Sequence, residues 1–265
     1  MKCSGFARMY GAVAAAAAAL AAPLSGCGEG APPVVHNERD ASTPPEPPEP
    51  VTLFPEAPPL PGEAECKVVI QTGIPVPSAG HLPACTPVQY ATNPPSGGDH
   101  WGSWAAYKRY EAEVPRELYV HNLEHGAIVL AYRCPASGCA EVTAMLDEVR
   151  TEAASDPRCL MLPGGPEARL VMTSDGALDT PIAAAAWGAT YTATCLDKAS
   201  LSRFVADNYA KGPEDTCGDA AAVDVDRPDG GAPRCDGAMP DAGAPDASPA
   251  ETPGGDAPGG GTPGL

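Results

Sequence analysis

The middle of the chain alternates short apolar runs with turn-forming residues. Runs rich in β-branched, aromatic or small apolar residues predict strands at 67–70, 118–120, 127–132, 169–172, 182–187 and 191–194. Apolar residues recur at helical spacing in two other stretches. Helices are therefore predicted at 139–153 and 200–209, the second capped by Ser200.

This succession predicts a single compact α/β domain over residues 63–217, with an α+β arrangement as the alternative. The order of elements after residue 127 is similar to that of a thioredoxin-like fold, with Thr180-Pro181 standing where such folds often carry a cis-proline. Cys134 and Cys139 lie between a strand and a helix, as redox cysteines do there, but four residues separate them. Because the tight C-x-x-C loop is absent, a structural disulfide is favoured over a redox pair.

The two flanks of this domain have compositions that do not support a core. Residues 28–62 are rich in Pro, Glu and Ala and predict an extended spacer. Residues 218–265 repeat Asp, Ala, Gly and Pro and predict a disordered acidic tail. Residues 224–230 faintly resemble a calcium loop but lack its spacing and terminal glutamate, so a solvated tail is the favoured interpretation.

Residues 1–27 have the pattern of a lipoprotein signal peptide. Lys2 and Arg8 precede an apolar stretch that is too short for a permanent membrane span, and Leu24-Ser25-Gly26-Cys27 matches a lipobox. Acylation of Cys27 would anchor the mature protein in a membrane. We therefore expect a lipid-anchored protein of the bacterial cell envelope that faces the periplasm or the cell exterior.

The net charge of −18 makes nucleic acid an unsuitable partner, because phosphate binding needs a basic surface. Much of this charge comes from the predicted spacer and tail, so it does not describe the chemistry of the domain.

Eight cysteines remain once Cys3 and Cys27 are set aside: Cys66, Cys85, Cys134, Cys139, Cys159, Cys195, Cys217 and Cys235. An even set in an exported protein predicts up to four disulfides. Proximity along the chain favours the pairs 66–85, 134–139, 159–195 and 217–235.

The candidate chemistry is concentrated in His121-Asn122-Leu123-Glu124-His125, in a chain with five histidines. Imidazoles at close spacing beside a carboxylate are typical of zinc and copper sites. We predict a site formed by His100, His121 and His125, with Glu124 as ligand or support. The alternative is that these histidines only form hydrogen bonds within the core. His81 is a weaker fourth candidate, expected in an exposed loop, and the aromatic run from Trp101 to Tyr110 is expected to pack in the core.

His121-x-x-Glu124-His125 also matches the inverted zinc-peptidase motif. That motif requires a helix, and the apolar run after Gly126 argues against one here. A metal-dependent hydrolase that uses Glu124 as its base is kept as an alternative, together with a non-catalytic interaction module.

Two segments, 93–101 and 120–126, resemble a bacterial family catalogued as domain of unknown function 3105, whose members pair Pro-Pro-x-Ser-Gly-x-His with His-x-Leu-Glu-His-Gly. The stretch 181–188 also resembles that family's Ala-Trp-Gly strand. The resemblance covers most of residues 88–210 and implies no activity. The chain departs from the pattern at Gly97-Gly98-Asp99, where an extra residue precedes His100 and is expected to shift it.

Overall fold

The structure, a computed structural model, describes residues 47–218 and 222–235. The predicted signal peptide, Cys27 and most of the spacer lie outside the described residues, as does the tail from 236 onward. None of the described helices is long and apolar enough to span a bilayer.

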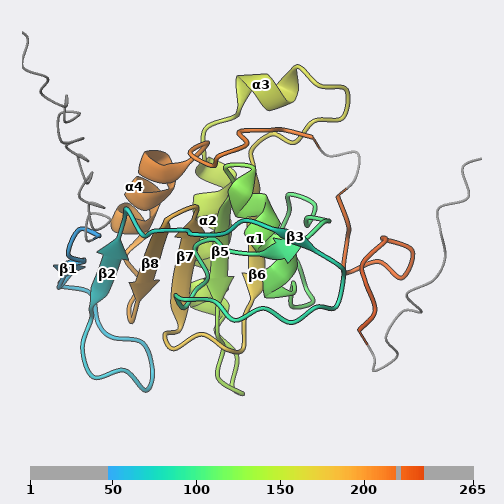
Figure 1. Cartoon of the computed structure of the whole chain (residues 1–265). Coiled ribbons are helices and arrows are strands. Elements are labelled where there is room, and N and C mark those ends of the chain that lie inside the picture. The colour runs from blue at the N-terminus through green and yellow to red at the C-terminus, as the bar shows by residue number, and fades with distance from the viewer. Residues whose placement is uncertain (1–46, 219–221, 236–265) are drawn as a thin grey trace, which may run out of the picture. The chain divides into compact units, whose positions relative to one another are not determined.

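A six-stranded sheet forms the centre of the domain (Figure 1), with strand order β1-β2-β8-β7-β5-β6. Its strands are β1 (Val51–Leu53), β2 (Val68–Gln71), β5 (Ile128–Tyr132), β6 (Leu170–Ser174), β7 (Ile182–Ala186) and β8 (Ala189–Ala193). Only the β5–β6 pair is parallel within this sheet. A second, two-stranded parallel sheet pairs β3 (His81–Leu82) with β4 (His100–Trp101).

Helices cover both faces of the sheet. α1 (Arg116–Glu124) packs on one face, where it meets Val129 and Ala131 of β5 in one apolar cluster. α2 (Ala140–Glu152) and α4 (Lys198–Asn208) pack on the other face, against Ile128 and Leu130 of the same strand. Successive strand residues point to opposite faces, so a strand covered on both sides must be continuously apolar. That requirement explains the unbroken apolar run of β5. The short α3 (Pro157–Leu160) lies in the connection between α2 and β6.

The predicted α/β class is confirmed, and most predicted elements are present within a residue or two of their expected limits. β6, β5, β7 and β8 have the strand order of a minimal thioredoxin-like sheet. Two features differ from that expectation. α1 precedes β5 in the chain, and the cis X-Pro bond of the described residues is Asn93–Pro94, not Thr180–Pro181. α4 is capped by Asp197, which accepts a hydrogen bond from the backbone of Ser200, so the predicted cap at Ser200 is wrong.

The strand predicted at 118–120 is wrong, because these residues belong to α1. Leu118, Tyr119 and Val120 are all fully buried. A short apolar run that is buried on every side carries no periodicity, so its pattern cannot separate a strand from a buried helix.

The disulfides are Cys66–Cys195, Cys85–Cys235, Cys134–Cys139 and Cys159–Cys217. Only Cys134–Cys139 was predicted. Cys66 precedes β2 and Cys195 follows β8, and these antiparallel strands bring Val68 opposite Ala193. The sheet therefore pairs cysteines that are distant in sequence, and the other three predicted pairs were wrong because they assumed that the nearest cysteines pair.

Both ends of the described domain extend beyond the predicted limits of 63 and 217. β1 lies in the range assigned to the spacer and pairs with β2. In the predicted tail, Val223 forms a bridge with Ala105, and Lys108 contacts the carboxylates of Asp224 and Asp226 at 2.7 and 2.9 Å. Asp224 and Asp226 therefore form ion pairs with a lysine side chain of the domain.

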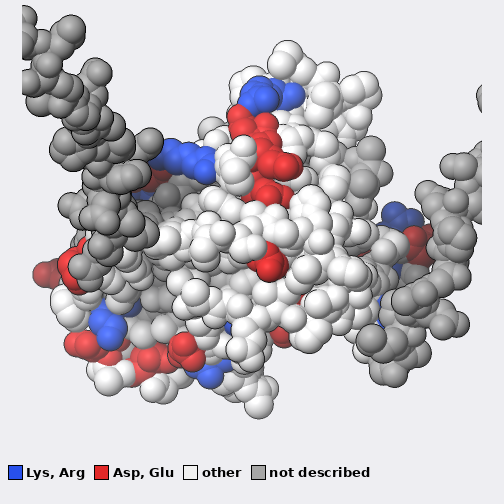
Figure 2. Space-filling model, viewed as in Figure 1, with Lys and Arg blue, Asp and Glu red and all other residues white. Residues whose placement is uncertain are grey.

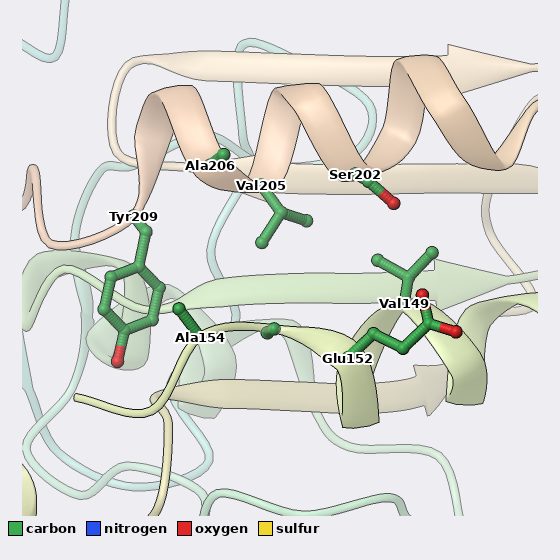
Figure 3. Close-up of a pocket in the computed structure, with 8 residues that line it drawn as sticks. Val149, Glu152, Ala154, Ser202, Val205, Ala206 and Tyr209 are labelled. Carbon is green, nitrogen blue, oxygen red and sulfur yellow. The ribbon is translucent and has the colours of Figure 1, made fainter.

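A cavity of about 360 Å³ lies between the C-terminal halves of α2 and α4. Figure 3 shows Val205 of α4, and Tyr209 just after this helix, facing Ala154 and Val149 across it. Its lining is mostly alanine and valine and contains no imidazole. The helices that form it cover the sheet face opposite to α1, so the histidine-bearing helix does not contribute to this cavity.

Candidate metal centre

The small β3–β4 sheet places His81 beside His100. The two residues are partners in the parallel register, and partners in adjacent strands project their side chains to the same side. The pairing is held by Asp99, which accepts a hydrogen bond from the backbone N–H of Gly80 at 2.8 Å. The N–H of His100 donates in turn to the carbonyl of Gly80 at 3.0 Å.

The end of α1 supplies the other half of the cluster. His121 and Glu124 are three residues apart on the helix, and His125 follows as its C-cap, so all three project from one face. Gly126 has a φ of 79°, which ends the helix and sends the chain into β5. The helix removes the objection that the apolar run after Gly126 raised against the H-x-x-E-H motif.

Side chains from these two elements converge on the carboxylate of Glu124. Nε2 of His81 lies 3.2 Å and Nε2 of His100 lies 3.1 Å from Oε2 of Glu124, and Nε2 of His121 lies 4.0 Å from the same oxygen. One donor atom from each of these four residues lies within 4.8 Å of all the others. For tetrahedral Zn²⁺ with bonds of about 2.0–2.1 Å, neighbouring ligand atoms lie about 3.3 Å apart. The contacts of His81 and His100 with Glu124 match this spacing, and Nε2 of His121 lies farther from the carboxylate.

Backbone carbonyls fix the orientation of two of the rings. Nδ1 of His100 contacts the carbonyl oxygen of Gly98 at 2.8 Å, and Nδ1 of His121 contacts that of Trp101 at 2.8 Å. A carbonyl only accepts hydrogen bonds, so each Nδ1 carries the proton and each Nε2 of the neutral ring keeps its lone pair. Metal-binding histidines are typically held in this way.

This proton assignment makes the cluster difficult to explain by hydrogen bonds alone. His100 contacts both a carbonyl and the carboxylate of Glu124, so it would have to carry protons on both nitrogens, or Glu124 would have to be protonated. Nε2 of His121 also faces Nε2 of His125 at 3.1 Å. A cation among the Nε2 atoms satisfies the lone pairs and the carboxylate together.

The cluster is buried on one side and open on the other. The side chain of His100 is fully buried, those of His121 and Glu124 are 3 % and 6 % exposed, and that of His81 is 50 % exposed. Burial lowers the pKa of His121 from 6.5 to about 4, aided by repulsion from the other three imidazoles, although the carbonyl of Trp101 opposes the shift. Burial also lowers the pKa of His125. The ring of His121 is therefore neutral at pH 7 and available as a ligand.

The metal-free protein should lose stability as the pH falls from about 6.5 to about 4. In this range the unfolded chain protonates His121 while the folded protein does not, so protons favour unfolding, by about 1.4 kcal/mol for each pH unit. Urea unfolding in the presence of a chelator measures this slope. His121→Gln should give a shallower slope, and an unchanged slope would contradict the assignment to His121.

A second group of donors adjoins the first. Nε2 of His125 lies 3.4 Å from Oε2 of Glu214, and these two side chains form a further possible metal-ligating group with Glu124. The ring of Trp104 packs against both His121 and His125, with centroids 5.1 and 4.8 Å away. Figure 2 shows acidic side chains in a row below the position of α3.

The segment 210–214 is held against the end of α1. The N–H of Ala210 donates to the carbonyl of Gly126 at 2.9 Å, and that of Glu214 donates to the carbonyl of Glu124 at 3.1 Å. Between them, a Cβ on Gly212 would lie 2.2 Å from the carbonyl oxygen of Glu124 and 2.3 Å from the nitrogen of Gly126. The close approach therefore requires glycine.

Gly212→Ala should displace this segment and lower the free energy of unfolding by about 1–3 kcal/mol, because the new methyl group meets backbone that cannot move aside. Gly102→Ala is the matched control, since nothing lies within 4 Å of a Cβ there. Chemical denaturation of the two variants measures the difference. Equal stability would show that the segment adapts freely.

The structure brings together three of the four predicted ligands, His100, His121 and Glu124, despite the extra residue before His100. His125 contacts His121 but falls in the second group. His81, predicted only as a weaker fourth candidate in an exposed loop, belongs to the first group, and Glu214 was missed. Nothing near either residue resembles a ligand motif, and only the β3–β4 pairing and the 210–214 segment bring them in.

The fold and the site together define an α/β domain with a buried histidine–carboxylate cluster that could hold a metal ion. Residues 81–220 match the family described as DUF3105, protein of unknown function, and the chain belongs to that family. All members of both donor groups fall within the matched range. Neither the search of curated proteins nor that of solved structures gave a match.

Proposed function

We propose that this domain binds a transition-metal ion through Nε2 of His81, His100 and His121 and the carboxylate of Glu124. The observation that carries the proposal is the convergence of three imidazoles on Glu124, two of which, His100 and His121, have Nδ1 already bonded to a backbone carbonyl. Three imidazoles and one carboxylate suit Zn²⁺ or Cu²⁺, because both ions bind neutral imidazole strongly.

Metal content of the full chain tests this proposal. The protein is stripped with a chelator, dialysed against Zn²⁺, and passed through a desalting column before elemental analysis. Wild type should retain zinc in a fixed molar ratio and show a higher melting temperature than the stripped protein, since a ligand that binds only the native state stabilises it. The double variant His100→Ala/His121→Ala should retain none. Retention of no zinc or copper by wild type would refute the proposal.

A metal-dependent hydrolase is the second candidate, and the helical position of His121, Glu124 and His125 favours it. In such an enzyme Glu124 would act as general base beside a metal-bound water. Its contacts with His81 and His100 favour a ligand role for Glu124. A Glu124→Gln variant that retains the metal but loses hydrolytic turnover would establish that the protein is an enzyme. Loss of metal in that variant would instead support the binding role.

We further propose that Cys27 is acylated and holds the domain at a membrane of the bacterial cell envelope, as the lipobox predicts. Cys27→Ala should release the protein from the membrane fraction and abolish incorporation of labelled palmitate. Unchanged membrane association of this variant would contradict the proposed anchor.

A further inference from the structure

The donors around Glu124 exceed the needs of one tetrahedral ion. His81, His100, His121 and Glu124 already provide four ligand atoms, which is the usual number for a closed zinc site. His125 and Glu214 stand outside that set, yet their side chains contact each other, and His125 also contacts His121. The two groups share Glu124.

His125 lacks a satisfactory set of partners among the described residues. It is only 4 % exposed, and its Nδ1 is buried with no hydrogen-bond partner there. Its Nε2 faces an Nε2 of His121 whose lone pair is free, because the Nδ1 of His121 carries the proton toward Trp101. Within the described part of the chain, Nδ1 of His125 is unpaired in either tautomer. With the proton on Nδ1, two Nε2 lone pairs face each other at 3.1 Å, an arrangement that cations beside them would stabilise.

We propose that the site is binuclear. A second divalent cation is bound by Nε2 of His125 and the carboxylate of Glu214, and Glu124 bridges it to the first ion. This inference rests on the proposed function, since the first ion is the one described above. A carboxylate has two oxygens and can ligate two cations, and paired ions in proteins lie roughly 3.5–4 Å apart. Glu124 can act as this bridge because it belongs to both groups.

The second ion would be the accessible one. The side chain of Glu214 is 52 % exposed, and His125 and Glu214 add only two ligands to the bridging carboxylate. The remaining positions are open, and water or an oxygen of a carbonyl substrate can bind there. The chain would thus provide one ion position filled by four protein ligands and a second position with coordination sites left open.

Zinc stoichiometry of the stripped and reloaded full chain tests the inference. Wild type should bind two ions per chain, and Glu214→Gln should bind one. Because Glu214 is half exposed, this variant should fold normally, and Glu141→Gln, an exposed carboxylate on α2, is the matched control expected to bind two. His125→Gln is a second test of the same position and should also bind one.

Each other outcome has a distinct meaning. One ion in both wild type and Glu214→Gln overturns the second position and leaves the proposed function intact. Two ions in both proteins, or one in wild type and none in Glu214→Gln, also overturn the inference, because Glu214 then does not hold the second of two ions. No ion in wild type refutes the proposed function itself. Copper loading gives an independent readout, since two Cu²⁺ ions at this separation should show a magnetically coupled spectrum that Glu214→Gln lacks.

Discussion

His100→Ala should weaken zinc binding by about 100-fold or more. Its Nε2 is one of the three nitrogens that converge on Glu124, and its side chain is fully buried, so neither water nor another residue can replace it. Loss of a partner that only orients a ligand typically weakens metal binding 10–100-fold, and loss of the ligand itself should weaken it at least as much. Competition with a chromophoric zinc chelator measures the dissociation constant.

His81→Ala and His36→Ala are the matched comparisons for this prediction. His81 is half exposed, so water can occupy its position and the loss should be smaller than for His100. His36 lies outside the described residues, in the predicted spacer, and its replacement should leave affinity unchanged. Equal zinc affinity of His100→Ala and wild type would show that His100 is not a ligand.

Arg169→Met should lower the free energy of unfolding by about 3–5 kcal/mol, because it removes the cation that pairs with the buried carboxylate of Asp156. The Arg169 side chain is only 1 % exposed and lies 2.8 Å from Oδ2 of Asp156 and 2.7 Å from Oδ1 of Asp215. It also donates to the backbone carbonyl of His125 at 2.7 Å. The same guanidinium therefore supports the core and the end of α1.

Urea denaturation of Arg169→Met and Arg203→Met measures this effect. Arg203 pairs with Asp207 on the surface of α4, where its side chain is 77 % exposed, so its replacement should cost no more than about 1 kcal/mol. Similar decreases in the free energy of unfolding of the two variants would show that burial does not increase the contribution of the Arg169 ion pair to stability. Arg169→Met should also weaken metal binding, because it loosens the backbone at His125.

Apolar patterns along the chain predicted most of the strands and helices, because α2 buries one face at helical spacing and the longer apolar runs of β5 and β6 are typical of strands buried on both sides. They failed at residues 118–120, where full burial on all sides leaves no periodicity to read. The pairing of the distant cysteines could not be predicted either, and the reason is different. Cys66 and Cys195 meet only through the β2–β8 register, and local sequence contains no information about that register.

The candidate site could be predicted where its residues are close in sequence. His121, Glu124 and His125 lie on one helical turn, and their spacing alone indicates a cluster. His81 and Glu214 enter through tertiary structure. His81 depends on a two-residue strand pairing with His100, and Glu214 depends on the close contact of Gly212 with the end of α1. The sequence around His81 or Glu214 gives no sign of either contact.

X-ray absorption at the zinc edge, recorded on the Glu214→Gln variant loaded with one equivalent of zinc, tests the central claim most directly. The account predicts a four-coordinate ion with three imidazole nitrogens and one carboxylate oxygen at about 2.0–2.1 Å. A spectrum with sulfur ligands, or a water-rich shell without imidazole scattering, would contradict it.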